Sequence, residues 1–103
     1  MNKLEYYDNI IAPLSKDLKM KAKIESLRFE KELYKLNIEH LEKKVLEQQK
    51  LKAEDYMTEV MKENIDICIT EFEVKIMEHQ NKMKMCDIQI TRECYNLKHY
   101  KGF

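Results

Sequence analysis

The stretch from Ile65 to Tyr100 carries the apolar pattern that most limits how this chain can fold. Steps of four and three residues connect a single ladder through the whole stretch. Its members are Ile65, Ile69, Phe72, Ile76, His79, Met83, Cys86, Ile90, Glu93, Leu97 and Tyr100. Such spacing places all members on one side of an α-helix and is typical of a coiled-coil seam. We therefore expect a helix here whose ladder packs against another helix.

The same stretch has a second apolar stripe on its outer face, away from the ladder. Its members recur every seven residues, and Asn81 is the polar interruption. They are Val60, Ile67, Val74, Ile88 and Tyr95. A helix with apolar residues on two faces has to be covered on two sides. We expect Ile67, Val74, Ile88 and Tyr95 to form a stripe that a protein partner covers.

A comparable ladder precedes this stretch and also follows 4-3 spacing. It consists of Met20, Ile24, Leu27, Lys31, Tyr34, Ile38, Leu41, Val45 and Gln48. β-branched residues at the a positions with Leu at the d positions favour two-stranded packing, and Lys31 at an a position restricts the register. Phe29, Leu33 and Leu36 form an additional stripe on another face. This helix is also expected to need more than one neighbour.

Between the two ladders, at about 49–56, the seam fades and its register slips by three residues. One interpretation is a continuous coiled-coil helix of about 88 residues that absorbs the slip. The other is an antiparallel hairpin with helices at 14–50 and 56–100. The absence of Gly, Pro and Asn from the intervening stretch favours the continuous helix, because helix ends often carry these residues.

Charge patterning favours the hairpin. Residues 35–52 carry five lysines against three glutamates, whereas residues 54–71 carry six acidic residues against one lysine. A fold-back would bring these oppositely charged segments together. The register slip and the apolar stripes on two faces support the same interpretation. Since a lone hairpin leaves the outer stripes exposed, we expect two hairpins to associate into a dimeric four-helix assembly.

The predicted domain organisation is an N-terminal arm or short helix at 1–12 followed by the coiled-coil hairpin at 13–103. Pro13 disfavours helical angles at Ala12 and removes an amide donor, which predicts a break there. The chain has a single glycine, a single proline and 37% charged residues. This composition is typical of long helices, and we expect an all-α protein.

Composition and cysteine usage indicate a soluble protein in a reducing compartment. The formal net charge is zero, so no bulk field attracts nucleic acid or an anionic membrane. The three cysteines lack a CxxC pattern and suggest free thiols. No stretch approaches the ~20 apolar residues of a membrane span, and the N-terminus does not resemble a signal peptide. We expect a cytoplasmic location, or one within a virus particle or virus-infected cell, without membrane contact.

The chain offers few residues for catalysis or cofactor binding. A helical bundle can hold a di-iron site through Glu-x-x-His pairs, and the sequence contains none. His79, Met83 and Cys86 on one seam are the best candidate ligands for a soft metal ion, but core packing explains them better. The two serines, Ser15 and Ser26, have no histidine nearby in the sequence, and no Gly-rich loop could bind phosphate. We predict no enzyme activity, small-molecule substrate, cofactor or metal.

Two positions of the ladder from Ile65 to Tyr100 are strongly polar. His79 and Glu93 could fix the register of the coiled coil, or they could pair with a residue of another helix such as Lys31.

The favoured hypothesis is a non-enzymatic coiled-coil interaction subunit, an assembly, scaffold or adaptor protein, that forms a homodimer through its heptad seams. The residues expected in this self-association seam are Ile24, Leu27, Ile38, Leu41, Val45, Ile69, Phe72, Ile76, Met83, Ile90 and Leu97. The alternative is a small regulatory binder, a chaperone or inhibitor that sequesters a protein target on the outer stripe. Nucleic-acid binding is the least favoured hypothesis and rests on a lysine-rich segment from Lys16 to Lys31.

Overall fold

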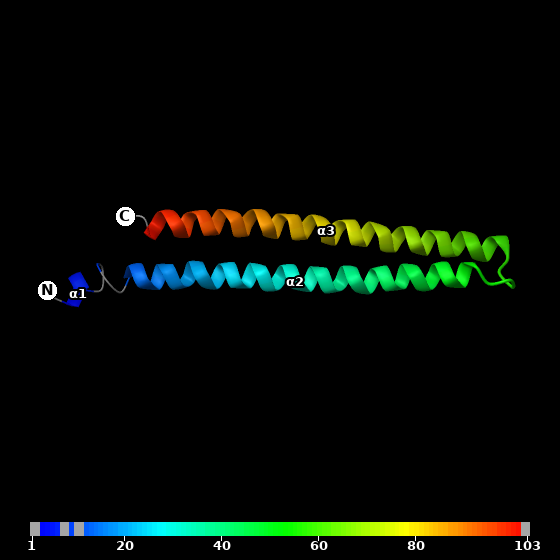
Figure 1. The fold of residues 1–103 in the computed structure, drawn as a ribbon, viewed down its shortest axis with the longest axis horizontal. Helices are drawn as coiled ribbons and strands as arrows, with labels where there is room; N and C mark the ends of the chain where they lie inside the picture. Colours follow the sequence, from blue (N-terminus) through cyan, green and yellow to red (C-terminus); the bar gives the residue numbers. More distant parts are fainter. Residues whose placement is uncertain (1–2, 7–8, 10–11, 102–103) are drawn as a thin grey trace. The chain divides into compact units, whose positions relative to one another are not determined.

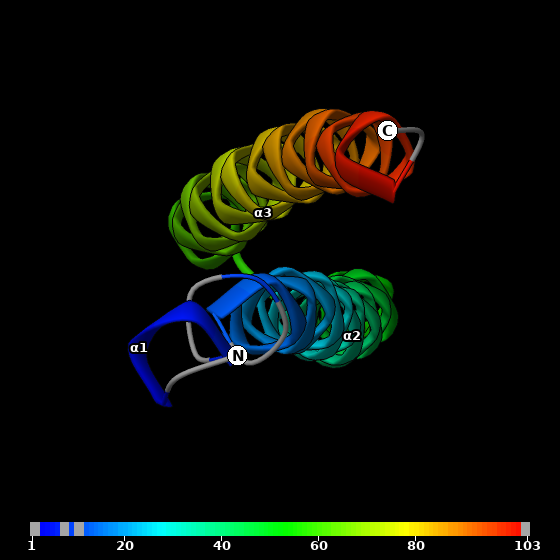
Figure 2. The ribbon, with the colours of Figure 1, turned by 90° about the vertical axis from the view of Figure 1, so that its left-hand side faces the viewer.

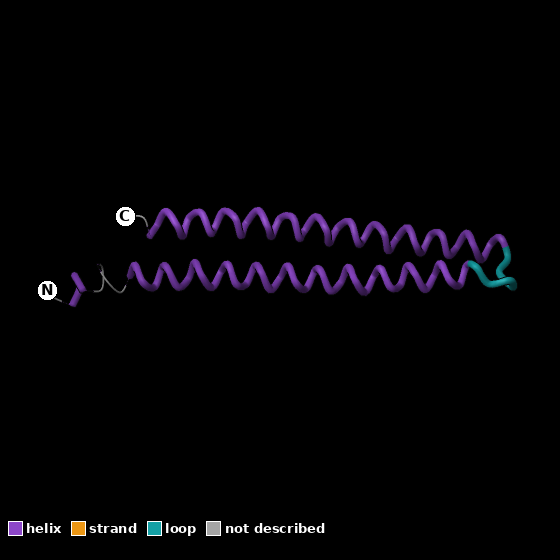
Figure 3. Tube along the Cα trace, in the orientation of Figure 1, coloured by secondary structure: helices purple, strands orange, loops and turns teal. Residues whose placement is uncertain are grey.

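The structure, a computed structural model, describes residues 3–6, 9 and 12–101, and all regular secondary structure within these residues is helical. Helix α1 spans Lys3–Tyr6, α2 spans Ala12–Lys52 and α3 spans Glu59–Lys101. Figures 1 and 3 show α2 and α3 joined by one short turn. The predicted all-α helical hairpin is therefore confirmed, and the alternative of one continuous helix is wrong.

The end of α2 is closed by short-range backbone hydrogen bonds. The amide of Ala53 donates to the carbonyl of Lys50 at 3.2 Å, and the amide of Glu54 donates to the carbonyl of Leu51 at 3.1 Å. These bonds to the third preceding residue satisfy carbonyls that have no partner within the helix. Lys50 and Lys52 lie in the last turn of α2, where a positive charge interacts favourably with the helix dipole.

Thr58 begins the second long helix as its N-cap. Its Oγ1 accepts a hydrogen bond from the amide of Met61 at 3.2 Å, and its carbonyl accepts one from the amide of Lys62 at 3.0 Å. Glu59 follows in the first turn, near the positive end of the helix dipole. The chain can therefore turn at 53–58 without Gly, Pro or Asn. The absence of those residues, which favoured a continuous helix, was a weaker signal than the threonine cap.

The chain divides into two compact parts, each built from one segment of α2 and one of α3. The terminal part comprises residues 1–30 and 86–103, and the turn part comprises residues 31–85. In the turn part the two helix segments run antiparallel, because the turn at 53–58 joins them directly. Figures 1 and 2 show α2 and α3 side by side.

The N-terminal arm expected at 1–12 is described only in part. α1 is a single helical turn on which Leu4 is exposed. Residues 7–8 and 10–11 of the expected arm lie outside the described residues, as does the end of the chain at 102–103. α2 already begins at Ala12, so that Pro13 occupies its first turn. Proline is tolerated there because its missing amide would have no partner within the helix.

The two predicted ladders form the cores of the two parts. The buried side chains are Ile24, Leu27, Ile38, Leu41, Ile65 and Cys86. All six belong to the ladders, and the other ladder side chains from Met20 to Leu97 are half-buried. The side chain of Tyr100 lies outside the described part of the chain. The 4-3 spacing therefore identified the face that each helix buries.

Candidate interaction surfaces

Polar contacts between the helices of the turn part join lysines of α2 to α3. The Nζ atom of Lys52 lies 2.7 Å from Oδ1 of Asp66, and Nζ of Lys44 lies 5.7 Å from the centre of the Phe72 ring. The Lys52–Asp66 pair follows the charge difference that favoured the hairpin, whereas Lys44 contacts a neutral ring. Since the Lys52 and Asp66 side chains are 40% and 54% exposed, water screens the pair and it contributes at most about 1 kcal/mol. The contacts align the helices, and the apolar ladders stabilise them.

The side chain of His79, a polar residue of the α3 seam, contacts an aromatic ring of α2. The centres of the His79 and Tyr34 rings are 5.7 Å apart with an interplanar angle of 36°. Nζ of Lys82 lies 5.6 Å from the centre of the same tyrosine ring. Nδ1 of His79 is buried and has no hydrogen-bond partner among the described residues. Two residues of α3, His79 and Lys82, therefore contact the Tyr34 ring. These contacts fix which part of α3 packs beside Tyr34 of α2.

Glu93, the other polar seam residue, forms an ion pair across the helices of the terminal part. Its Oε1 lies 3.0 Å from Nζ of Lys23, and the Glu93 side chain is 15% exposed. The partner is Lys23 and not Lys31, the residue named from the sequence. Interhelical pairing was one of the two roles expected for Glu93, and the structure shows this role.

The outer stripes remain exposed in the hairpin. Eight stripe side chains have exposed fractions between 45% and 67%, namely Phe29, Leu33, Leu36, Val60, Ile67, Val74, Ile88 and Tyr95. Met77 and Met85 on α3 are also exposed. Tyr95 packs on His99 one turn further along its own helix, with ring centres 4.0 Å apart. No other described element covers these side chains.

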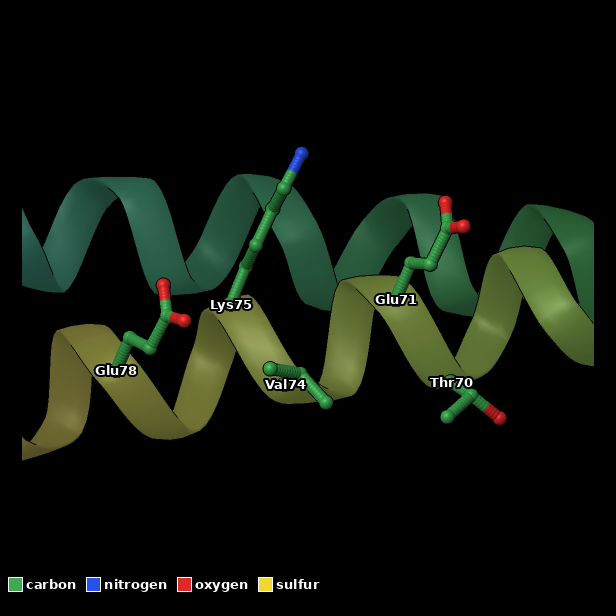
Figure 4. A pocket seen from close by; sticks show the side chains of 5 residues that line it. All are labelled: Thr70, Glu71, Val74, Lys75 and Glu78. Atoms are coloured by element: carbon green, nitrogen blue, oxygen red, sulfur yellow. The ribbon is translucent and has the colours of Figure 1, made fainter.

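A surface hollow of about 320 Å³ lies along the outer stripe of α3, in the turn part. It is lined by Thr70, Glu71, Val74, Lys75 and Glu78. Figure 4 shows that these five side chains all come from α3. Val74 supplies an apolar floor, and the aliphatic stems of the charged residues extend it. The hollow is large enough for one apolar side chain of a partner.

A second hollow, of about 390 Å³, lies between α2 and α3 in the terminal part. It is lined by Lys21, Ile24, Glu25, Arg28, Cys94 and Leu97. The two cations already have carboxylate partners. Nζ of Lys21 lies 3.2 Å from Oδ2 of Asp17, and Nη1 of Arg28 lies 3.1 Å from Oε1 of Glu25. Cys94 is half-buried, Cys68 is exposed and Cys86 is buried, all as free thiols. Neutralised cations make this hollow a poor site for an anion.

The candidate metal ligands His79, Met83 and Cys86 follow one another along the packed ladder of α3. Cys86 is buried and the other two are half-buried. Among the described residues, no three His, Cys, Asp or Glu side chains form a group that could hold a metal ion. None of the helices in the described part of the chain combines the length and apolarity that a bilayer crossing requires.

No family model, curated protein or solved structure matches this chain. Its function is therefore argued from its surfaces.

The structure separates the two residue sets that the sequence analysis named. Every residue of the predicted self-association seam, from Ile24 to Leu97, is buried or half-buried in the hairpin. Every residue of the predicted partner stripe is exposed. Self-association through the seam stays a prediction, whereas the stripes are the apolar surfaces open to a partner. Met77 and Met85 lie near the stripe of α3 in the helical repeat, and both are exposed.

Proposed function

We propose that this chain is a non-enzymatic coiled-coil interaction subunit, an assembly, scaffold or adaptor protein that self-associates as a homodimer. The observation that supports this most is the pair of exposed apolar stripes, one on α2 and one on α3. Large contiguous apolar surfaces on soluble proteins usually mark sites of protein contact. A hairpin whose helices are apolar both toward and away from each other has an apolar surface available for another molecule.

The free energy that is gained when stripe side chains are buried indicates what kind of partner is needed. Burying one exposed Val, Leu, Ile or Phe side chain stabilises a complex by about 1.5–3 kcal/mol. Association costs about 4–15 kcal/mol in lost freedom of motion. One stripe residue would not offset this cost, whereas four would contribute roughly 6–12 kcal/mol. The partner must therefore cover several helical turns, as another long helix does.

The proposed partner is accordingly a protein, and in the first instance a second copy of this chain. Two hairpins that cover each other's stripes form the four-helix arrangement that helix packing favours. The proposed role involves no cofactor, metal, small-molecule substrate or membrane. The proposed location is the cytoplasm, or a virus particle or virus-infected cell.

A second candidate is a regulatory binder, a chaperone or inhibitor that stays monomeric until a target covers Ile67, Val74, Ile88 and Tyr95. The hollow at Val74 favours this function, because it offers one apolar side chain of a target a defined place. The scaffold predicts that the isolated chain has the mass of a dimer or a larger species, whereas the regulatory binder predicts the mass of a monomer.

Sedimentation velocity across a concentration series tests the proposal. The scaffold predicts a dimer or larger species of the isolated chain, and the double variant Ile67→Ser with Val74→Ser should weaken it. Tyr56→Ser is the control, since the Tyr56 side chain is also exposed but lies in the turn. A wild-type chain that stays monomeric at its highest soluble concentration would overturn the scaffold and leave the regulatory binder.

A further inference from the structure

The outer face of α3 changes the sign of its charge along the helix. Three rows of residues form this face, and each row recurs every seven residues, starting at Val60, Glu63 and Asn64. Its members with a formal charge are Glu63, Glu71 and Glu78 before Asn81, and Lys84, Arg92 and Lys98 after it. All six side chains are exposed, and none of them forms an ion pair with another described residue. One half of the face is therefore acidic and the other half is basic.

The outer face of α2 has no such division. Lys19 is followed there by Glu25, and Lys43 lies between Glu39 and Glu47. Only the face of α3 therefore has two separated halves of opposite charge. These halves meet when the α3 helices of two copies lie antiparallel, with each acidic half on the basic half of the other copy.

The apolar stripe of α3 is symmetric about Asn81. Val74 and Ile88 lie seven residues before and after Asn81, and Ile67 and Tyr95 lie fourteen residues before and after it. All four side chains are exposed. An antiparallel copy centred on Asn81 therefore places Val74 opposite Ile88 and Ile67 opposite Tyr95.

The same arrangement brings opposite charges to the same side of the contact. Glu63 and Lys98 belong to one row and lie 18 and 17 residues from Asn81, and Glu71 and Arg92 belong to another row and lie 10 and 11 residues from it. Residues of one row lie on the same side of a two-fold symmetric antiparallel contact, so each glutamate meets its basic counterpart. A parallel contact would instead place Glu71 against Glu71 and Arg92 against Arg92. The charges therefore favour the antiparallel direction.

The hollow at Val74 gives the apolar contact a defined position. Figure 4 shows Val74 between Thr70 on one side and Glu71 and Glu78 on the other. Lys75 also lines the hollow, which leaves it with two carboxylates against one ammonium group. An isoleucine that is followed by an arginine one turn later, as Ile88 is by Arg92, matches both the apolar floor and the acidic border.

Asn81 is the polar interruption of the stripe, and it lies at the centre of this arrangement. A carboxamide both donates and accepts hydrogen bonds, so the Asn81 side chains of two copies are complementary when they face each other. A polar residue at one core position of a coiled coil fixes the register and the number of chains. The antiparallel pair therefore gives Asn81 a structural role.

We propose that two copies of this chain pair antiparallel through the outer faces of α3, about a two-fold axis at Asn81, with Ile88 of each copy in the hollow at Val74 of the other. The inference rests on the proposed self-association and specifies its surface and direction. The contact is isologous, so each pair of residues occurs twice and the contact closes as a dimer. Since the chain has a formal net charge of zero, no overall repulsion opposes it.

Charge reversal tests the pairing. The first variant, Glu63→Lys with Glu71→Lys, makes the acidic half basic, and the second, Arg92→Glu with Lys98→Glu, makes the basic half acidic. Each variant alone should dimerise at least about tenfold more weakly, because like charges then meet on both sides of the axis. An equimolar mixture should form mixed dimers, because both of their half-contacts join opposite charges. The variant that carries all four substitutions should dimerise like the wild-type chain for the same reason.

The matched controls are Glu39→Lys with Glu42→Lys, and Lys35→Glu with Lys43→Glu. These pairs change the net charge equally at exposed positions of α2, outside the proposed face. Sedimentation velocity measures dimerisation, and circular dichroism verifies that each variant stays helical. The controls should dimerise like the wild-type chain.

Disulfide cross-linking tests the direction without any change of charge. The variant Val74→Cys with Ile88→Cys, in a chain that also carries Cys68→Ser and Cys94→Ser, should form covalent dimers on air oxidation. Val74→Cys alone in the same background should not, because an antiparallel pair holds the two copies of position 74 fourteen residues apart along the helix. Cross-linking of Val74→Cys alone as efficiently as of the double variant would show that the antiparallel pairing is wrong.

The outcomes separate this inference from the proposed function. Loss in each reversed variant, recovery in the mixture and in the fourfold variant, and unchanged controls support the pairing. If the wild-type chain self-associates and both reversed variants do so equally well, the pairing is wrong and the proposed function stands. If both reversed variants lose association and neither the mixture nor the fourfold variant recovers it, the pairing is also wrong. A wild-type chain that never associates overturns both.

Discussion

A buried leucine of the seam should contribute more to the free energy of unfolding than an exposed leucine of an outer stripe. Leu41 is 8% exposed in the ladder of α2, and Leu36, five residues earlier on the same helix, is 58% exposed in the outer stripe. Leu41→Ala and Leu36→Ala remove the same atoms from the two environments. Both substitutions place alanine in a helix interior, where its intrinsic propensity is slightly better than that of leucine. The difference between their effects on the free energy of unfolding therefore measures the contribution of burial.

The structure predicts a difference of about 2–3 kcal/mol between the two variants. Leu→Ala removes three carbon atoms, and at about 0.8 kcal/mol per buried methylene the transfer loss at Leu41 is roughly 2.4 kcal/mol. A cavity should add little, because a two-helix core lies close to solvent and can collapse. Leu36→Ala should cost less than about 0.5 kcal/mol in the monomer, as surface substitutions usually do.

Urea unfolding followed by circular dichroism measures this difference, and it should be performed at two protein concentrations. At a concentration where the chain is monomeric, Leu41→Ala should lower the free energy of unfolding and Leu36→Ala should not. At high concentration Leu36→Ala should also become destabilising if a partner copy covers the stripe, since binding to the folded state adds stability. Equal destabilisation by both variants in the monomer would refute the assignment of buried and exposed faces.

Three further predictions concern individual contacts. Thr58→Ala should destabilise the chain by about 1 kcal/mol through loss of the N-cap, and Thr58→Ser should restore most of it in thermal unfolding; an unaffected Thr58→Ala would show that the cap does not hold the turn. Lys23→Ala should cost about 0.5–1 kcal/mol at low salt and less at high salt, because screening weakens its pair with the half-buried Glu93; a salt-independent loss would contradict the ion pair. Phe72→Ala should cost about 1–3 kcal/mol, below the 3–5 kcal/mol of a fully buried ring, because Phe72 is only half-buried; a larger loss in urea unfolding would mean that a partner covers the ring.

Much of the fold followed from the spacing of apolar residues. The ladders predicted which faces would be buried, and Ile38, Leu41 and Ile65 are buried in the turn part as their positions require. This works because helical periodicity is a local property, in which residues three and four apart share a face whatever the rest of the chain does. The same periodicity identified the stripe at Ile67 and Val74 as the surface left exposed.

The turn was harder to predict, because its signals were distributed among ordinary residues. Thr58 caps α3, and Lys50 and Lys52 close α2, yet each of these residue types is also common inside helices. The register slip, the apolar stripes on two faces and the opposite charges of the flanking segments indicated that the chain folds back, and the Lys52–Asp66 pair shows that the charged segments meet. The predicted turn at 49–56 consequently lies a few residues before the observed turn at 53–58.

The sequence by itself determined that this chain is built of long helical segments, which face of each segment is apolar toward a partner helix, and that both segments have a second apolar face. Those properties depend only on neighbours along one helix. Tertiary structure alone decided that α2 and α3 turn back on each other, that Tyr34 contacts His79 and Lys23 pairs with Glu93, and that the outer stripes stay uncovered within the described chain. These outcomes depend on contacts between residues far apart in the sequence, which compete in free energy with a continuous helix and carry no local periodic signal.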